Sequence, residues 1–336
     1  MQKPILHVCL CLAAIISLYT LLQSQFPTRR QLPDVAHITA HVAVERLEQV
    51  LFGLDSKLEV QAFLKKNSLF ATQFLGLAAG SEEGELVERL WAMVHNPHIQ
   101  ALYREVQQVF GDCAALRQQF EAAFRHLRFY YPNFKIPQLV TFITGMGTDL
   151  YVSKELIVIG LDFFLGESAK FRPIDLPQYI LRAYQPTDIV PKTLLLLSQQ
   201  FIKTQAADQT LLADMLHYGK AYYFAQAMLP EVKAHTLLAY TPAQLADVEG
   251  HQNVVWAHFI EHELFYVTNH FTKNKYITDR PFVSEIGPRC PSNIGRWLGW
   301  EIIKQYMQNH PKVGLPDLMR NCDVRQLFSL ARYRPR

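Results

Sequence analysis

The sequence predicts an α+β protein that is predominantly α-helical, and three observations support this class. Apolar residues recur at intervals of three and four along most of the chain, which is typical of helices with one buried face. Two short runs rich in β-branched residues, 136–143 and 156–161, interrupt that period and indicate a small sheet. The 336 residues are 49% hydrophobic and 19% charged, a composition that supports a large core and excludes a disordered chain.

The first 25 residues are predicted to lie apart from the fold. Lys3 precedes an apolar run from Ile5 to Leu22, and polar residues follow it. A positive start and an apolar run of about 18 residues are typical of a secretory signal peptide or a short membrane anchor. We therefore expect residues 1–25 to direct export or membrane association. Residues 26–336 are expected to form one mainly helical domain.

The elements of this domain follow from local patterns. Helical spacing extends over residues 34–111, and a further helix is expected over residues 112–130. Residues 136–143 and 156–161, with residues 149–152 between them, favour a small antiparallel sheet. Helices are then expected for the rest of the chain, with prolines at the joins.

Capping residues predict where the later helices begin. Asp208 is expected to cap a helix that ends before Pro230. Thr241 begins a capping box, with proline at the first helical position, and that helix is expected to continue towards Val267. Ser292 is expected to cap the helix that carries the last tryptophans of the chain.

Charge and motifs exclude several classes of function. The 33 basic and 30 acidic residues are nearly balanced and form no long basic run, which argues against nucleic acid as a partner. The sequence contains no phosphate-binding glycine loop, no dinucleotide fingerprint, no serine-hydrolase elbow and no H-E-x-x-H motif. No cofactor is predicted.

One histidine motif leaves a metal site open as an alternative. His258, Glu261 and His262 match the H-x-x-E-H pattern, and two histidines four apart share one face of a helix, as ligands of one zinc ion must. The surrounding residues are equally typical of an amphipathic core helix. We therefore predict no metal and keep a zinc-dependent peptidase as the alternative.

A glycine in the middle of a predicted helix marks a second place of interest. Gly219 in the run His217-Tyr218-Gly219-Lys220 costs about 1 kcal/mol relative to alanine, which suggests close packing against a neighbour. Lys220 is either a buried charge with a carboxylate partner, such as Asp162, Asp214 or Glu261, or a lysine that reaches the surface.

Several segments between residues 150 and 310 resemble, in their order and spacing, the GldB family of gliding-motility-associated envelope lipoproteins of Bacteroidota. The segments that carry this resemblance are Gly160–Gly166, Leu176–Tyr179, Asp188–Pro191, Tyr218–Lys220, Tyr240–Gln244 and Pro291–Ile303.

The resemblance implies an accessory role in gliding motility, in organisms that couple this machinery to type IX secretion. It also implies a lipoprotein, but no cysteine closes the apolar N-terminal run, so an uncleaved anchor or an ordinary signal peptide are alternatives. The implied partners are envelope proteins of the gliding or secretion machinery, with contact to the membrane through the N-terminal segment.

The family is also distantly similar to zinc peptidases of the zincin type, in which a small sheet precedes the H-E-x-x-H helix. At the corresponding place this chain has His217-Tyr218-Gly219-Lys220-Ala221, without the base glutamate and the second histidine. The resemblance thus implies a zincin-like fold without a complete metal site, whose cleft could bind a peptide or a carboxylate without hydrolysing it. The candidate residues of this degenerate cleft are Asp162, His217, Tyr218, Lys220, Glu261, Arg296, Trp297 and Trp300.

The function predicted from the sequence is therefore that of a non-enzymatic envelope protein. It would act as a binding or assembly component in gliding motility and the associated secretion. The alternatives are the zinc-dependent peptidase and a purely structural envelope protein.

Overall fold

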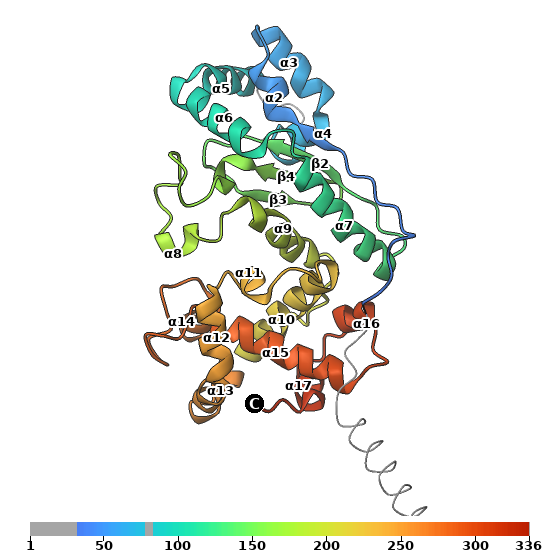
Figure 1. Ribbon diagram of the computed structural model, residues 1–336, viewed down its shortest axis with the longest axis vertical. Helices are drawn as coiled ribbons and strands as arrows, with labels where there is room; N and C mark the ends of the chain where they lie inside the picture. Colours follow the sequence, from blue (N-terminus) through green and yellow to red (C-terminus); the bar gives the residue numbers. More distant parts are fainter. Residues whose placement is uncertain (1–31, 78–82, 336) are drawn as a thin grey trace, which may run out of the picture.

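A four-stranded sheet lies between two groups of helices in the computed structural model, which describes residues 32–77 and 83–335 (Figure 1). The predicted signal peptide or anchor at residues 1–25 lies outside this part of the chain. No helix in the described part is long and apolar enough to cross a membrane. The prediction of an α+β, mainly helical fold is confirmed.

Helices both precede and follow the central strands along the chain. Those that precede the central strands are α2 (Leu47–Phe52), α3 (Lys57–Lys66), α4 (Ser68–Gln73), α5 (Glu83–His95), α6 (Pro97–Phe110) and α7 (Ala114–Tyr130). Those that follow are η1 (Leu161–Phe164), α8 (Gln178–Leu181), η2 (Pro186–Asp188), α9 (Ile189–Ser198), α10 (Leu211–Met228), α11 (Ala234–Leu238), α12 (Pro242–Gly250), α13 (Gln252–Glu261), η3 (Leu264–Tyr266), α14 (His270–Ile277), α15 (Ile294–Asn309), α16 (Leu315–Arg320) and α17 (Val324–Ala331).

The sheet is mixed, so the prediction of an antiparallel sheet holds for only one of its three pairings, and a strand at residues 44–46 lies where a helix was expected. The strands β1 (Val44–Arg46), β2 (Gln138–Phe142), β4 (Leu156–Gly160) and β3 (Leu150–Val152) lie side by side in that order. β1 and β4 both run parallel to β2, and only β3 and β4 are antiparallel. The reason is burial: β2 and β4 are apolar on both faces, so they pair with each other at the centre and leave the less buried β3 at the edge.

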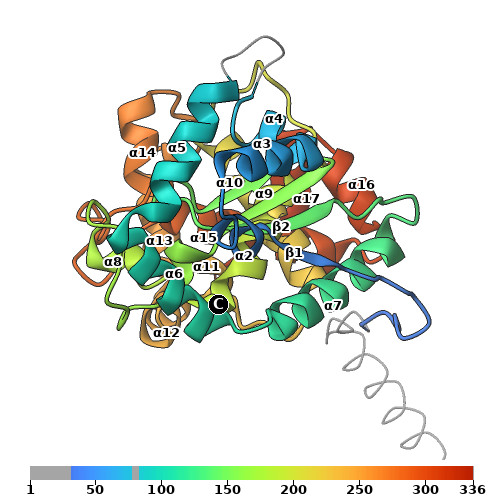
Figure 2. The same ribbon diagram turned by 90° about the horizontal axis from the view of Figure 1, so that it is seen from above.

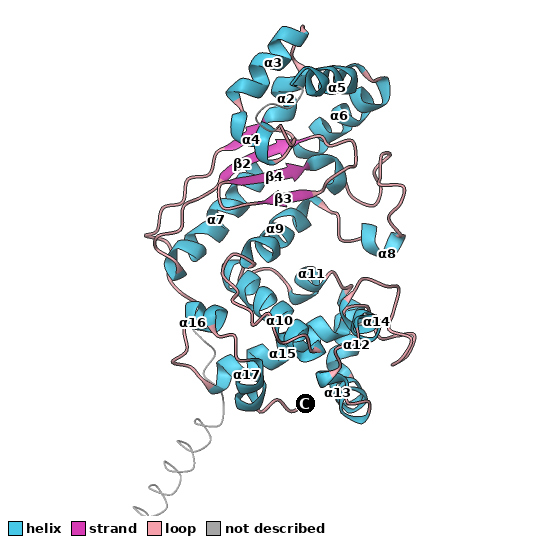
Figure 3. Ribbon diagram, turned by 180° about the vertical axis from the view of Figure 1, so that it is seen from behind, coloured by secondary structure: helices cyan, strands magenta, loops and turns pink. Residues whose placement is uncertain are grey.

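Alternate side chains of the two central strands enter two separate cores. One face packs against helices α2–α5, which lie over the strands when the molecule is seen from above (Figure 2). The other face packs against α7 and the large group of helices from α9 onwards, on the opposite side of the sheet (Figure 3). Val140, Phe142, Leu156 and Val158 face the first core, and Leu139, Ile157 and Ile159 face the second.

Helices α10 and α15 approach each other at two glycines in the second core. A Cβ atom at Gly219 would lie 2.9 Å from the backbone nitrogen of Trp300 and closer still to the carbonyl of Gly299. A Cβ atom at Gly299 would overlap the backbone carbonyl of Met215. The two backbones are therefore in direct contact, as the glycine in the middle of the predicted helix suggested.

The ends of the later helices differ in part from their predictions. The hydroxyl of Thr210, not Asp208, caps α10, since it accepts from the N–H of Ala213. The capping box of Thr241 is confirmed, but the helix ends at Gly250 and a new one begins after His251.

The start of α15 also lies one residue beyond its predicted cap. Asn293 occupies the cap position in place of Ser292, with a φ of 58° in the left-handed region that asparagine tolerates. Pairs of adjacent polar residues make such single-position differences hard to resolve from sequence alone.

The glycine contact predicts a strong effect of one methyl group. We expect Gly299→Ala to lower the free energy of unfolding by about 3 kcal/mol, because the obstructing atoms belong to the backbone of α10 and cannot move aside alone. Chemical denaturation measures the change. Gly250→Ala is the matched control, since a methyl group there meets no atom within 4 Å. Equal stability of the two variants would contradict this account.

Candidate functional site

Two neighbouring cavities lie where the edge strand β3, α9, α10 and α15 meet. Their volumes are ≈ 240 Å³ and ≈ 120 Å³, and the larger one is lined in part by Leu150, the first residue of β3. Four side chains line both cavities, namely Lys192, Leu195, Tyr222 and Arg296. Two cations from different helices thus share one site.

Lys192 occupies the first turn of α9 and is half-buried. Its ammonium lies 4.1 Å from the centre of the Tyr184 ring. It has no hydrogen bond or ion pair within the described part of the chain, although an ammonium can donate three hydrogen bonds. Burial lowers the pKa of Lys192, and three nearby carboxylates oppose that shift. These are Asp149, Asp188 and Asp279.

The three carboxylates are held by other donors. Asp149 accepts from the Tyr184 hydroxyl and from the N–H of Leu150, both at 2.8 Å. Asp188 accepts from the N–H of Gln185 at 2.9 Å. Asp279 accepts from the Asn293 amide at 2.6 Å. The Lys192 ammonium therefore neighbours negative charge without being bound by it.

Arg296 enters the site from the first turn of α15. Its guanidinium carbon lies 4.3 Å from the centre of the Tyr218 ring, a contact of a kind worth about 0.5–2 kcal/mol. Its Nε donates to the carbonyl of Ile277 at 2.6 Å, and its charge also faces the hydroxyl of Tyr222. These contacts fix the plane of the guanidinium beside the cavities.

The smaller cavity combines the same two cations with the carboxylates of Asp188 and Asp279, so only the larger cavity has a net positive lining. Lys192 and Arg296 face a single carboxylate there, that of Asp149, whose two oxygens already accept hydrogen bonds. The remaining wall is mainly leucine, alanine and tyrosine. An anionic group with an apolar neighbour is the ligand that such a lining favours.

Some residues predicted for the cleft are brought together here. Tyr218 and Arg296 are in direct contact, and Trp300 supports them from the core through Tyr222, with ring centres 5.5 Å apart. Trp297 is fully buried and lines neither cavity.

The other predicted residues make separate contacts. Asp162 is buried and accepts from the N–H groups of Thr144 and Met146, so it stabilises the turn before β3. Burial raises the pKa of Asp162, and these hydrogen bonds oppose that change. His217, on α10, is half-buried and has its ring edge-on to Tyr218.

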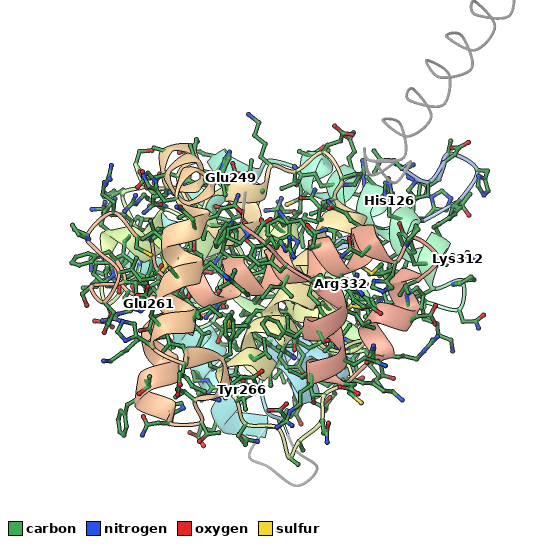
Figure 4. All side chains as sticks on the ribbon, turned by 90° about the horizontal axis from the view of Figure 1, so that it is seen from below. His126, Glu249, Glu261, Tyr266, Lys312 and Arg332 are labelled. Carbon is green, nitrogen blue, oxygen red and sulfur yellow. The ribbon has the colours of Figure 1, made fainter. Side chains whose placement is uncertain are left out.

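Lys220 and Glu261 have different surroundings. Lys220 is buried and donates to the carbonyl of Asn321, beside α16, and not to a carboxylate. Glu261 is exposed at the end of α13, on the lower side of the molecule (Figure 4). The structure therefore does not bring Glu261 to Lys220.

The H-x-x-E-H motif also lies on α13 and the residue after it. The rings of His258 and His262 are 4.5 Å apart, but His258 Nε2 lies 3.0 Å from the Tyr276 hydroxyl and Glu261 is exposed. In the described ranges, no group of three or more histidine, cysteine, aspartate or glutamate residues is placed to hold a metal ion.

Sequence reasoning missed Lys192, Asp149, Tyr184 and Tyr222. Helices were expected between the sheet and residue 208 without individual bounds, so α9 was not singled out. A usable signal was present, because Lys192 is the single charge in the run IVPKTLLLL. A lone charge in an apolar helix indicates a cation that faces a cavity or a buried partner.

Comparison with protein families gives a match over nearly the whole chain. The model of the family described as Gliding motility protein GldB matches residues 28–335, nearly the whole chain. No curated protein and no solved structure gives a significant match, so the similarity to zincins stays a prediction.

The buried Lys220 predicts a dependence of stability on pH. Burial lowers the pKa of Lys220 to about 8 from its ordinary 10.5. Between these values the unfolded chain binds a proton that the folded chain has released, so the contribution of Lys220 to stability rises with pH. We expect the stability of the wild type relative to Lys220→Met to increase between about pH 7.5 and about pH 9.5 in urea unfolding.

Lys154→Met is the control for this measurement, since Lys154 is exposed in the turn between β3 and β4. Its difference from the wild type should stay constant over the same range. A constant difference for Lys220→Met as well would contradict the burial of an ammonium without a carboxylate partner at this position.

Proposed function

The chain belongs to the GldB family of gliding motility proteins, and on this premise we propose that it is a non-enzymatic binding component. The family places it among motility proteins of the cell envelope. In this proposal it supports gliding and the associated secretion machinery by holding a partner protein of the envelope. The binding site is the cleft that Lys192 and Arg296 line.

The observation that supports this proposal most is that the half-buried Lys192 ammonium has no hydrogen-bond acceptor in the described chain. A half-buried ammonium that contacts the Tyr184 ring but has no hydrogen bond or ion pair in the described chain is costly, since the ring contact offsets only part of the desolvation. Three nearby aspartates oppose the lowering of its pKa by burial, while each accepts a hydrogen bond from another donor. Such an arrangement keeps a cation available for an anionic group that arrives from outside.

The lining of the cavities favours binding over catalysis. Hydrolases that use a nucleophile pair a serine or cysteine with a histidine base. Among the described residues that line the two cavities, none is a serine, a cysteine or a histidine. The lining instead supplies fixed cations and aromatic surfaces, which can bind and orient a ligand.

Removing the ammonium provides the direct test. We expect Lys192→Met to weaken the partner complex about 30-fold or more, because loss of one member of a buried charge pair costs at least about 2 kcal/mol. Affinity isolation from envelope fractions measures partner retention, and colony spreading measures motility. Lys154→Met is the matched control and should behave as the wild type.

Normal motility and an unchanged set of partners for folded Lys192→Met would contradict the binding role. That result would favour the purely structural alternative.

The zinc-peptidase alternative has its own measurement. We expect the purified protein to hold less than stoichiometric zinc after dialysis, because the described chain offers no cluster of three ligands. Stoichiometric zinc together with peptide cleavage, both lost in His258→Ala or His262→Ala, would overturn the non-enzymatic proposal.

A further inference from the structure

The edge strand β3 carries unpaired backbone groups. The N–H of Gly160 donates to the carbonyl of Asp149, and the N–H of Ser153 donates to the carbonyl of Leu156, both at 2.8 Å. In an antiparallel pair alternate residues face the partner strand, so the residues between these, Leu150 and Val152, direct their N–H and C=O groups away from β4.

These outward groups are largely free within the described residues. The N–H of Leu150 donates to the neighbouring Asp149 carboxylate at 2.8 Å. The carbonyl of Leu150 and both backbone groups of Val152 have no partner on that side in the described chain. A sheet edge of this kind can accept another extended strand.

The larger cavity lies at the start of this edge. Leu150 lines it together with Leu195, Leu196 and Ala221, and Leu196 is 44% exposed although it is a large apolar residue. The volume of ≈ 240 Å³ is about eight times the share of one water molecule in the liquid, about 30 Å³. This is room for one apolar side chain and a small polar group.

The charged side chains that line the larger cavity determine which part of a peptide can bind there. Lys192 and Arg296 together favour an anion and disfavour the ammonium of an N-terminus. The interior of a peptide backbone carries no charge, whereas its C-terminus carries a carboxylate in line with the strand.

On the basis of the proposed function above, we propose that the cleft binds the C-terminal carboxylate of an extended peptide segment of the partner. The segment pairs with Leu150–Val152 as an additional strand. Because the cations lie at the beginning of β3, a carboxyl terminus that reaches them runs antiparallel to β3. The last side chain occupies the leucine-lined cavity.

The test uses the purified full-length chain and acetylated pentapeptides Thr-Val-Thr-Val-Xaa, where Xaa is Ala, Val, Leu, Met or Phe. Each peptide is made as a free acid and as a C-terminal amide, and binding is measured by fluorescence anisotropy. We expect at least one free acid to bind tenfold or more tightly than its amide. Lys192→Met should abolish this difference between acid and amide.

Two variants of Val152 test the strand pairing. Val152→Pro removes the outward N–H of this residue and leaves the hydrogen bonds to β4 in place. Edge strands accommodate such a proline. The variant should therefore weaken the binding of acid and amide alike. Val152→Thr retains the N–H and should bind as the wild type. Slower hydrogen exchange of the Val152 amide in the wild type, on addition of the tightest free acid, checks the same contact without a substitution.

Equal binding of acids and amides, or no binding of any peptide, overturns this inference. So does tighter binding of an amidated peptide with a free N-terminus, which would assign an ammonium to the cleft. Any of these three binding results, together with impaired motility of Lys192→Met, would refute only the peptide ligand. Normal motility and partner capture of that variant would refute the binding function itself.

Discussion

The contact of α10 with α15 at Gly219 and Gly299 is the constraint on which the site depends. Because neither residue has a Cβ atom, the two backbones touch, and this fixes the position of α15 along α10. Tyr218 is the neighbour of one glycine, and Arg296 lies about one turn before the other. The stacking of the guanidinium on the tyrosine ring follows directly from this crossing.

The order of the strands provides the second half of the site. β2 and β4 are buried on both faces and pair in parallel at the centre, so the shorter β3 forms the edge next to the cavities. In a simple meander β3 would lie between β2 and β4, and its backbone groups would all be used. A free edge beside two cations exists only because the strands pair in the observed order.

The candidate site could be predicted in part, and helix geometry explains the limits. Tyr218 and Arg296, both proposed for one cleft from the family resemblance, lie in contact. Lys220 lies two residues after Tyr218, which is about 200° around the helix, so it faces α16 instead. Trp297 is about 100° from Arg296 and therefore enters the core. Spacing shows which residues share a face, but not which neighbour that face meets.

The sequence by itself determined the class of fold, the approximate extents of β2, β3 and β4 and of helices such as α7 and α10, the capping box at Thr241 and the close packing at Gly219. These features depend on residues within a few positions of one another, where propensity and periodicity act. Only the tertiary structure decided the parallel pairing of β2 with β4, the open edge of β3 and the meeting of Lys192 with Arg296. Those depend on contacts between distant segments, and burial of the whole core selects them from several arrangements that local patterns allow equally well.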